Sequence, residues 1–172
     1  TELGDPAVGV HLDGVYSPRM QGALALMYDV DRVEALRGPQ GTLYGRNTLA
    51  GAVNLVTAKP TGELSGSAEV SYGNYDYWRG KATLNLPAIG PFSVKLSGQL
   101  SKRDGYYDVV PNPFPAAAFF ANPPQVNDAN SLDGKSFMAQ VRFEPTDNLT
   151  FDYMYDYSKY DQRPRPGQLL RV

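Results

Sequence analysis

Residues 29–60 read DVDRVEALRGPQGTLYGRNTLAGAVNLVTAKP. Glycine recurs through the middle of this stretch, where it permits tight turns and close approach of backbones, and Pro39 stiffens the turn after Arg37. Residues 53–58 place Val53, Leu55 and Thr57 on one side and Asn54, Val56 and Ala58 on the other, which is typical of a short strand. The glycines of the stretch are Gly38, Gly41, Gly45 and Gly51.

The segment around the beginning of this stretch has two interpretations. Leu26, Val30, Val33 and Leu36 recur at the spacing of one helical face, which favours a helix over residues 26–36. The same residues are compatible with a strand over 31–37, and the residues alone leave both open.

After Thr61 the pattern changes to strict alternation of apolar and polar residues. Five segments alternate, and each has about the length with which a tilted strand crosses a bilayer. We therefore predict five antiparallel strands with one apolar and one polar face. They cover residues 64–72, 78–86, 92–100, 137–143 and 149–157.

The connections between these strands differ in length. Residues 73–77, 87–91 and 144–148 are short, whereas residues 105–135 form a long, proline-rich loop. A loop of this length counts against a compact soluble domain, but an outer-membrane barrel has short turns on one side and long loops on the other. Aromatic residues at both ends of the strands predict two interfacial girdles. These residues are Tyr72, Trp78, Tyr155 and Tyr157 at the loop ends, and Phe92, Phe143 and Phe151 at the turn ends. A soluble β-sandwich also alternates and stays open as an alternative.

The composition argues against catalysis and against nucleic acid. The net charge is −2, there is no cysteine, and His11 is the single histidine. With a single histidine and no cysteine, the chain offers no Cys/His metal site. It offers no convincing Ser–His–Asp set either. Residues 41–46 lack the Gly-Lys-Ser/Thr ending of a phosphate loop. We expect no enzyme, no cofactor and no metal, and we interpret Asp152 and Asp156 as a solvated face.

Residues 29–60 resemble the end of the plug domain of TonB-dependent outer-membrane receptors. That pattern has an acidic-Arg-Val-Glu strand, then Leu-Arg-Gly-Pro, a Leu-Tyr-Gly turn, a small-residue glycine segment and an Asn-centred strand ending in Thr and a basic residue. Nearly every element matches, although Ala50-Gly51 stands where paired glycines are frequent. Residues 10–16 resemble the preceding plug strand, and the resemblance makes residues 31–37 a strand.

The resemblance implies an α+β plug segment over residues 1–60, followed by antiparallel transmembrane β-barrel strands over residues 61–172. About 22 strands close a plugged barrel of this type, so the expected barrel is incomplete. The chain opens without an initiator Met or a signal peptide, and we interpret both ends as cut. The first part of the plug, with its TonB box, is expected to lie outside this sequence.

The implied function is active uptake of a large, scarce nutrient across the Gram-negative outer membrane. An iron–siderophore complex is the usual class of ligand, with cobalamin, haem or glycans as others. The expected partners are this ligand, the outer-membrane lipid and the TonB–ExbB–ExbD complex, which acts through the plug. A soluble or surface β-sheet binding module without transport is the alternative, and a receptor that only senses its ligand is another.

Two sets of residues are candidates for function. Tyr16, Arg19 and Gln21 follow a strand in the plug, and loops carry binding more often than strands do, so we predict ligand contact there. An arginine can bind an anionic chelate by charge-assisted hydrogen bonds. A plug–barrel charge cluster is also expected, in place of ordinary solvated faces. Its members are Arg32, Glu34, Arg37, Glu69, Arg79 and Lys81.

Overall fold

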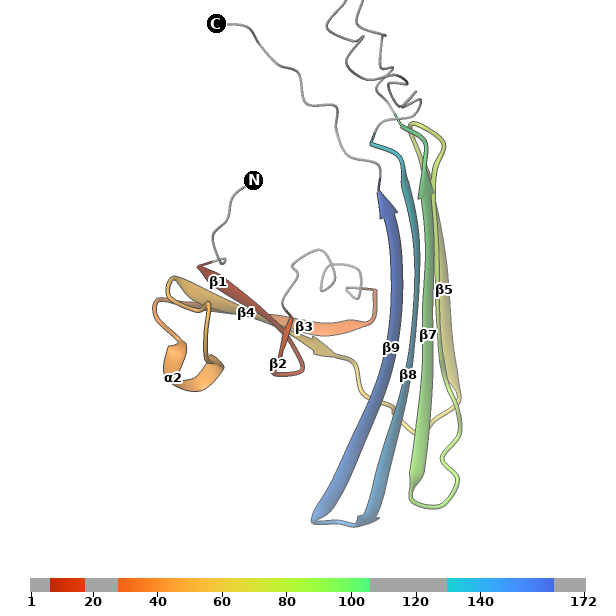
Figure 1. The fold of residues 1–172 in the computed structure, drawn as a ribbon. Helices are drawn as coiled ribbons and strands as arrows, with labels where there is room; N and C mark the ends of the chain where they lie inside the picture. The colour runs from red at the N-terminus through yellow and green to blue at the C-terminus, as the bar shows by residue number, and fades with distance from the viewer. Residues whose placement is uncertain (1–6, 18–27, 106–129, 163–172) are drawn as a thin grey trace, which may run out of the picture.

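The computed structural model describes residues 7–17, 28–105 and 130–162, which form two separate β-sheets (Figure 1). The first is a four-stranded sheet in the order β2-β1-β4-β3. Its strands are β1 (Val8–Leu12), β2 (Val15–Ser17), β3 (Val30–Arg37) and β4 (Gly51–Thr57). The second is a five-stranded sheet in chain order. Its strands are β5 (Ser65–Gly73), β6 (Tyr77–Asn85), β7 (Phe92–Arg103), β8 (Leu132–Thr146) and β9 (Leu149–Gln162).

The strand predicted over residues 31–37 is present as β3, so the helical interpretation of this segment is wrong. β3 pairs antiparallel with β4, which also pairs in parallel with β1. β4 is therefore central and almost wholly buried, with backbone partners on both sides. The backbone pairing of β3 with the buried strand β4 overrides the helical spacing of the apolar residues.

Residues 10–16, expected to belong to one strand, form two. Asp13 and Gly14 have φ of 48° and 82°, and this pair of positive values is what a two-residue type I′ hairpin turn requires. The turn folds β2 back onto β1, with Leu12 opposite Val15. An Asp-Gly pair between apolar residues is a strong hairpin signal that the expectation overlooked.

The glycines of the first sheet lie at its edges and turns. Gly38 and Gly45 have positive φ, and Gly45 ends the short helix α2 (Gly41–Tyr44). At Gly51 a β-carbon would lie 2.5 Å from the carbonyl oxygen of Leu36, so only glycine lets β3 and β4 approach so closely here. Gly41 begins α2 and faces open space.

All five predicted strands of the second sheet are present, and each pairs antiparallel with its neighbour along the chain. Three of these strands are longer than predicted, because β7 runs on to Arg103, β8 spans Leu132–Thr146 and β9 runs on to Gln162. β5 and β9 lie at the edges, so the sheet does not close. In the described part of the chain, no helix combines the length and the apolar character needed to span a membrane.

The second sheet is inverted relative to a soluble sandwich. On β7 and β8 the polar face is the buried one, including Lys95, Ser97 and Gln140. The apolar face is open, and Val70, Tyr153 and Phe151 are exposed by 82%, 67% and 55%. Water would make such a face unfavourable, whereas lipid hydrocarbon would cover it. The fold is thus a small α+β segment followed by antiparallel strands of the transmembrane-barrel type.

The first sheet lies beside the concave, polar face of the second (Figure 1), and its hydrogen bonds to that face run to β7 and β8. A small apolar cluster joins the two sheets. Leu12, Tyr28 and Leu55 come from the first sheet and its approach segment, and Met138 comes from β8. This contact positions the site described next.

Candidate functional site

The contact between the two sheets is centred on a buried ion pair. Asp29 precedes β3, and its carboxylate accepts a hydrogen bond from the Lys95 ammonium of β7 at 2.7 Å. The two side chains are 7% and 4% exposed, so water scarcely reaches either charge. The hydroxyl of Ser97 donates to the other carboxylate oxygen at 2.5 Å. Residues 66 positions apart are thereby fixed to each other.

The pair is well satisfied by its surroundings. Lys95 also donates to the carbonyl oxygen of Ala58 at 2.9 Å, immediately after β4. A buried charge is tolerated only where its partners replace the lost water, and the ammonium has two acceptors here while the carboxylate has two donors. The ion pair therefore connects the entry to β3, the exit from β4 and the middle of β7.

A second polar connection lies beside the first. The Asp13 carboxylate accepts the backbone N–H of Thr57 at 2.9 Å and its hydroxyl at 2.6 Å. Lys59 pairs with the same carboxylate at 3.2 Å. Gln140 of β8 donates its amide to the Thr57 hydroxyl oxygen at 2.8 Å, in a buried position. The β1–β2 turn, the end of β4 and the face of β8 thus share one hydrogen-bonded chain.

The apolar cluster lies at the same contact between the two sheets. Met138 is fully buried at 0% exposure, and Leu55 at 2% packs in the same cluster. Burial raises the pKa of the Tyr28 phenol, and the neighbouring Asp29 carboxylate raises it further. Both effects keep the phenol neutral beside the ion pair.

The predicted ligand-contact residues are only partly within the described chain. Tyr16 lies on β2, where its hydroxyl accepts a hydrogen bond from the Asn47 amide at 2.8 Å. The Arg46 guanidinium stands 5.7 Å from the Tyr16 ring centroid, and the His11 ring meets the same ring edge-on at 5.6 Å. Arg19 and Gln21 lie outside the described residues. Ligand contact by these residues stays a prediction.

The six charges predicted to form a plug–barrel cluster fall into two groups. Arg32 pairs with Asp31 and Glu34 inside the first sheet. Glu69 pairs with Arg79 and Lys81 inside the second. Arg37 is exposed at the end of β3. Across residues 7–17, 28–105 and 130–162, no ion pair joins the two groups, and the ion pair between the sheets is Asp29 with Lys95.

The sequence holds one indication of this ion pair, on the lysine side. Lys95 lies between Ser93 and Ser97 on the polar face of its strand. A lysine with small neutral neighbours on a covered face needs an acidic partner from another segment. Nothing in the sequence around Asp29 pointed to Lys95 as its partner. In the described ranges, no group of three or more His, Cys, Asp or Glu residues could hold a metal ion.

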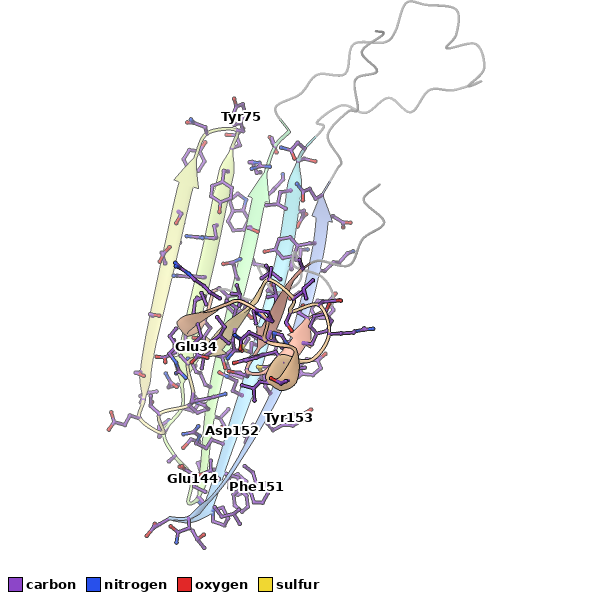
Figure 2. The ribbon with its side chains drawn as sticks, turned by 90° about the vertical axis from the view of Figure 1, so that its left-hand side faces the viewer. Glu34, Tyr75, Glu144, Phe151, Asp152 and Tyr153 are labelled. Atoms are coloured by element: carbon purple, nitrogen blue, oxygen red, sulfur yellow. The ribbon has the colours of Figure 1, made fainter. Side chains whose placement is uncertain are left out.

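Asp152 and Asp156 had been interpreted as a solvated face. Both are exposed on β9, and Asp152 also accepts two hydrogen bonds from the Arg142 guanidinium, at 2.8 and 3.0 Å. Figure 2 shows Asp152 near the end of the sheet that carries Glu144 and Phe151, with Tyr75 at the opposite end. A bidentate pair across β8 and β9 stiffens this end of the sheet.

The chain is similar in sequence to known proteins. Residues 2–52 match the family model of the TonB-dependent receptor plug domain. The pesticin receptor of Yersinia pestis is 39% identical over 84 residues, which make up 48% of this chain and 12% of that receptor. The metal-pseudopaline receptor CntO of Pseudomonas aeruginosa is 45% identical over 58 residues, or 34% of this chain and 8% of that receptor.

Solved structures resemble both sheets together. The ferric yersiniabactin uptake receptor FyuA of Yersinia pestis matches with a TM-score of 0.72 and 26% identity, over 91% of this chain and 23% of that one. The pyoverdine outer-membrane receptor FpvA of Pseudomonas aeruginosa matches with a TM-score of 0.68 and 20% identity, over 90% and 21%, which shows a common fold. The chain therefore spans only a small part of the length of these relatives.

Proposed function

Because this chain belongs to the TonB-dependent receptors, we propose that it is part of an outer-membrane receptor that takes up an iron–siderophore complex or a similar metal chelate. Residues 1–60 are assigned to the plug and residues 61–172 to the barrel wall. The receptor makes no covalent change to its ligand. It binds the chelate from outside and admits it when the plug is rearranged.

The inverted second sheet is the observation that carries this proposal. Its apolar face is open and its polar face is covered by the first sheet, with Lys95 and Ser97 buried beneath it. This arrangement suits a barrel wall with lipid outside and a plug in a polar lumen. A soluble binding module would need the opposite arrangement, with Leu84, Leu96 and Phe151 packed in a dry core.

The ligand class rests on the relatives. Their names include receptors for ferric yersiniabactin, pyoverdine and a metal–pseudopaline complex, all of which carry metal chelates. Tyr16, Arg19 and Gln21 remain the proposed contacts on the plug. The arginine would bind an anionic chelate, and the tyrosine would pack against it.

TonB with ExbB and ExbD is the proposed source of energy. The complex would pull on the plug. As the plug moves, its exposed charges are proposed to pair with exposed charges of the wall. These residues are Arg32, Glu34 and Arg37 on the plug, and Glu69, Arg79 and Lys81 on the wall. Exposed pairs of this kind add little stability, so they can form and break readily.

Membrane topology gives the first test, in a full-length protein from which any cysteine outside residues 1–172 has been removed, since these residues contain none. A single cysteine is placed in the β5–β6 turn by Asn74→Cys or in the β8–β9 turn by Asp147→Cys, in the full-length protein. A maleimide that cannot cross membranes should label the Asn74→Cys protein on intact cells. It should label the Asp147→Cys protein only after the outer membrane is opened. The reverse pattern, or a protein found outside the outer-membrane fraction, would refute the barrel.

Uptake is the second test. A strain that lacks the receptor is supplied with radioactive iron as ferric yersiniabactin, ferric pyoverdine or iron citrate, with and without the full-length protein. Uptake of at least one siderophore complex should depend on the protein and vanish when the proton gradient is dissipated. Binding that persists without uptake in energised cells would instead support a receptor that only senses its ligand.

A further inference from the structure

The segment that joins the two sheets is itself fastened to the wall. Residues 58–62, called the strap below, follow β4 of the plug and lead towards β5 of the wall (Figure 1). The Ala58 N–H donates to the carbonyl oxygen of Asp29 at 3.2 Å. The Ala58 carbonyl oxygen accepts from Lys95 of β7 at 2.9 Å. The strap therefore leaves the plug at the buried ion pair.

Farther along, the strap forms backbone hydrogen bonds to the short-turn end of the wall. The Thr61 N–H donates to the side-chain oxygen of Asn85 at 3.3 Å, and the Ala88 N–H donates to the carbonyl oxygen of Gly62 at 2.8 Å. Asn85 ends β6 and is 8% exposed, and its amide nitrogen donates to the hydroxyl of Ser65 at 3.1 Å. Because an amide both accepts and donates, this one side chain ties the strap to β5 and β6.

Gly62 is the point of close approach between the strap and the wall. Its φ is 73°, and a β-carbon there would lie 2.9 Å from the hydroxyl oxygen of Ser93 and 3.2 Å from the β-carbon of Ala88. Gly90, in the neighbouring turn, also has a positive φ of 59°, but nothing lies within 4 Å of a β-carbon built there. Glycine at position 62 is thus needed for the contact as well as for the backbone. The strap covers Ser93, which is buried.

The contacts of the strap differ in kind from those of the plug. The plug is held on the wall through side chains, among them Lys95, Ser97 and Gln140. Thr61 and Gly62 are held through backbone groups, and their partners all belong to the wall. These groups keep their partners when the plug moves away, so nothing in a movement of the plug requires them to be released. A rearrangement can break the first set of contacts and leave the second intact.

We propose that the strap stays bound to the wall while the plug rearranges, and that it is the fixed end from which the plug returns. A movement that starts in the plug would stop at Ala58, and β4 would keep its position relative to β7 for the return. A plug without this fixed end would return slowly and leave the lumen open. This inference rests on the proposed function, because only a receptor that admits a ligand needs a plug that moves and returns.

Labelling of a cysteine beneath the strap tests whether it stays bound. Ser93→Cys is placed in the full-length receptor without other cysteines, and a membrane-permeant maleimide is applied to energised cells. Ferric yersiniabactin or ferric pyoverdine is supplied, whichever the receptor takes up. The labelling rate of Ser93→Cys should change by less than about two-fold during uptake, whereas that of Ser97→Cys, beneath Asp29, should rise about five-fold. Equal rises at the two positions, or no rise at Ser97→Cys, would overturn the proposal.

Two glycine variants show whether the strap is what protects Ser93→Cys. Gly62→Ala places a methyl group against Ser93 and should raise the labelling rate of Ser93→Cys about five-fold in resting cells. Gly90→Ala has the same backbone cost in open space and should leave the rate unchanged. The same labelling rate in both variants would mean that the strap does not cover this position.

Variants of Asn85 test what the strap does for transport. Asn85→Ala removes the acceptor of the Thr61 N–H, and during uptake it should make cells several-fold more sensitive to vancomycin, which an intact outer membrane excludes. Asn85→Asp keeps that acceptor and should restore resistance, since the Ser65 hydroxyl can donate to the carboxylate. Ser65→Ala removes only the bond within the wall and should behave as the wild type. The same sensitivity in Asn85→Ala and the wild type, or in resting and transporting cells, would contradict a fixed end.

Failure of the strap is distinguishable from failure of the receptor function. Outer-membrane location and siderophore uptake are measured in the protein with Ser93→Cys alone. A protein that inserts and takes up a siderophore complex, but in which Ser93→Cys becomes labelled during uptake, refutes only the strap. A wild-type protein that is absent from the outer membrane refutes the proposed function itself.

Discussion

The two halves of the barrel wall share one alternating pattern but differ in what covers their inner face. On β7 and β8 the plug buries the inner side chains, and Lys95 is 4% exposed in its pair with Asp29. On β5 and β6 the inner face is open, and Glu69 remains 46% exposed although it pairs with Arg79 and Lys81. The contribution of a charge pair to stability therefore depends on whether the first sheet buries it, and not on the alternating pattern of the strand.

Asp29→Ala should break this contrast with the largest effect. It leaves the Lys95 ammonium buried without its partner, and removal of one member of a buried pair costs about 3–5 kcal/mol. The plug should detach from β7, which hydrogen exchange would report as loss of protection in β3 and β4 of the full-length protein.

The double variant Asp29→Asn with Lys95→Met is the matched control for this change. It removes both charges and keeps the approximate volumes, so most of the protection should return. If the single variant protects as well as the wild type, the ion pair does not hold the plug on the wall.

Met138→Ala should have a somewhat smaller effect at the same contact. The side chain is fully buried between plug and wall, and its truncation should cost about 2–5 kcal/mol in the free energy of unfolding of the plug. Met138→Leu conserves volume and should cost less than about 1.5 kcal/mol. The free energies of unfolding of the two variants are compared by chemical denaturation, with amide hydrogen exchange in β4 as the signal. Equal losses would mean that the volume of this side chain does not govern the contact.

The contrast between the two faces also marks the limit of prediction from sequence. Alternation yields all five wall strands because side-chain direction has a period of two along any strand. It does not reveal which polar face is covered. Asp29 and Lys95 are 66 positions apart, and only the folded plug brings them together. The β1–β2 hairpin was missed for a local reason, since Asp13-Gly14 carried a turn signal within a resemblance to one strand.

Glu69→Gln should show how little an open pair contributes. Its carboxylate accepts from Arg79 at 3.1 Å and pairs with Lys81 at 2.9 Å, but all three side chains are more than a third exposed. Such a change should lower the stability of the second sheet only slightly, and less at high salt. Stability of the wall measured at low and high salt would check this. A loss as large as that of Asp29→Ala would contradict the comparison.

The smallest effect is expected in the plug itself, at Glu34. The Asn54 amide donates to this carboxylate at 3.0 Å and Arg32 donates at 2.8 Å. These bonds, with that from Asn54 the larger cause, lower the pKa of Glu34 below its usual value. The carboxyl therefore contributes stability that is present above its ordinary pKa and is lost as the pH falls through the lowered value.

Titration of Glu34 by NMR in the full-length protein separates the two partners. Asn54→Ala should raise the pKa more than Arg32→Gln, and only the Arg32 contribution should weaken as salt is added, since salt screens charges but not an amide hydrogen bond. A larger rise in Arg32→Gln would mean that the plug holds this carboxylate as an exposed ion pair, like Glu69 on the open wall. A larger rise in Asn54→Ala would show that β4 holds the Glu34 carboxylate through a neutral amide. The link between β3 and β4 at this point would then need no buried charge.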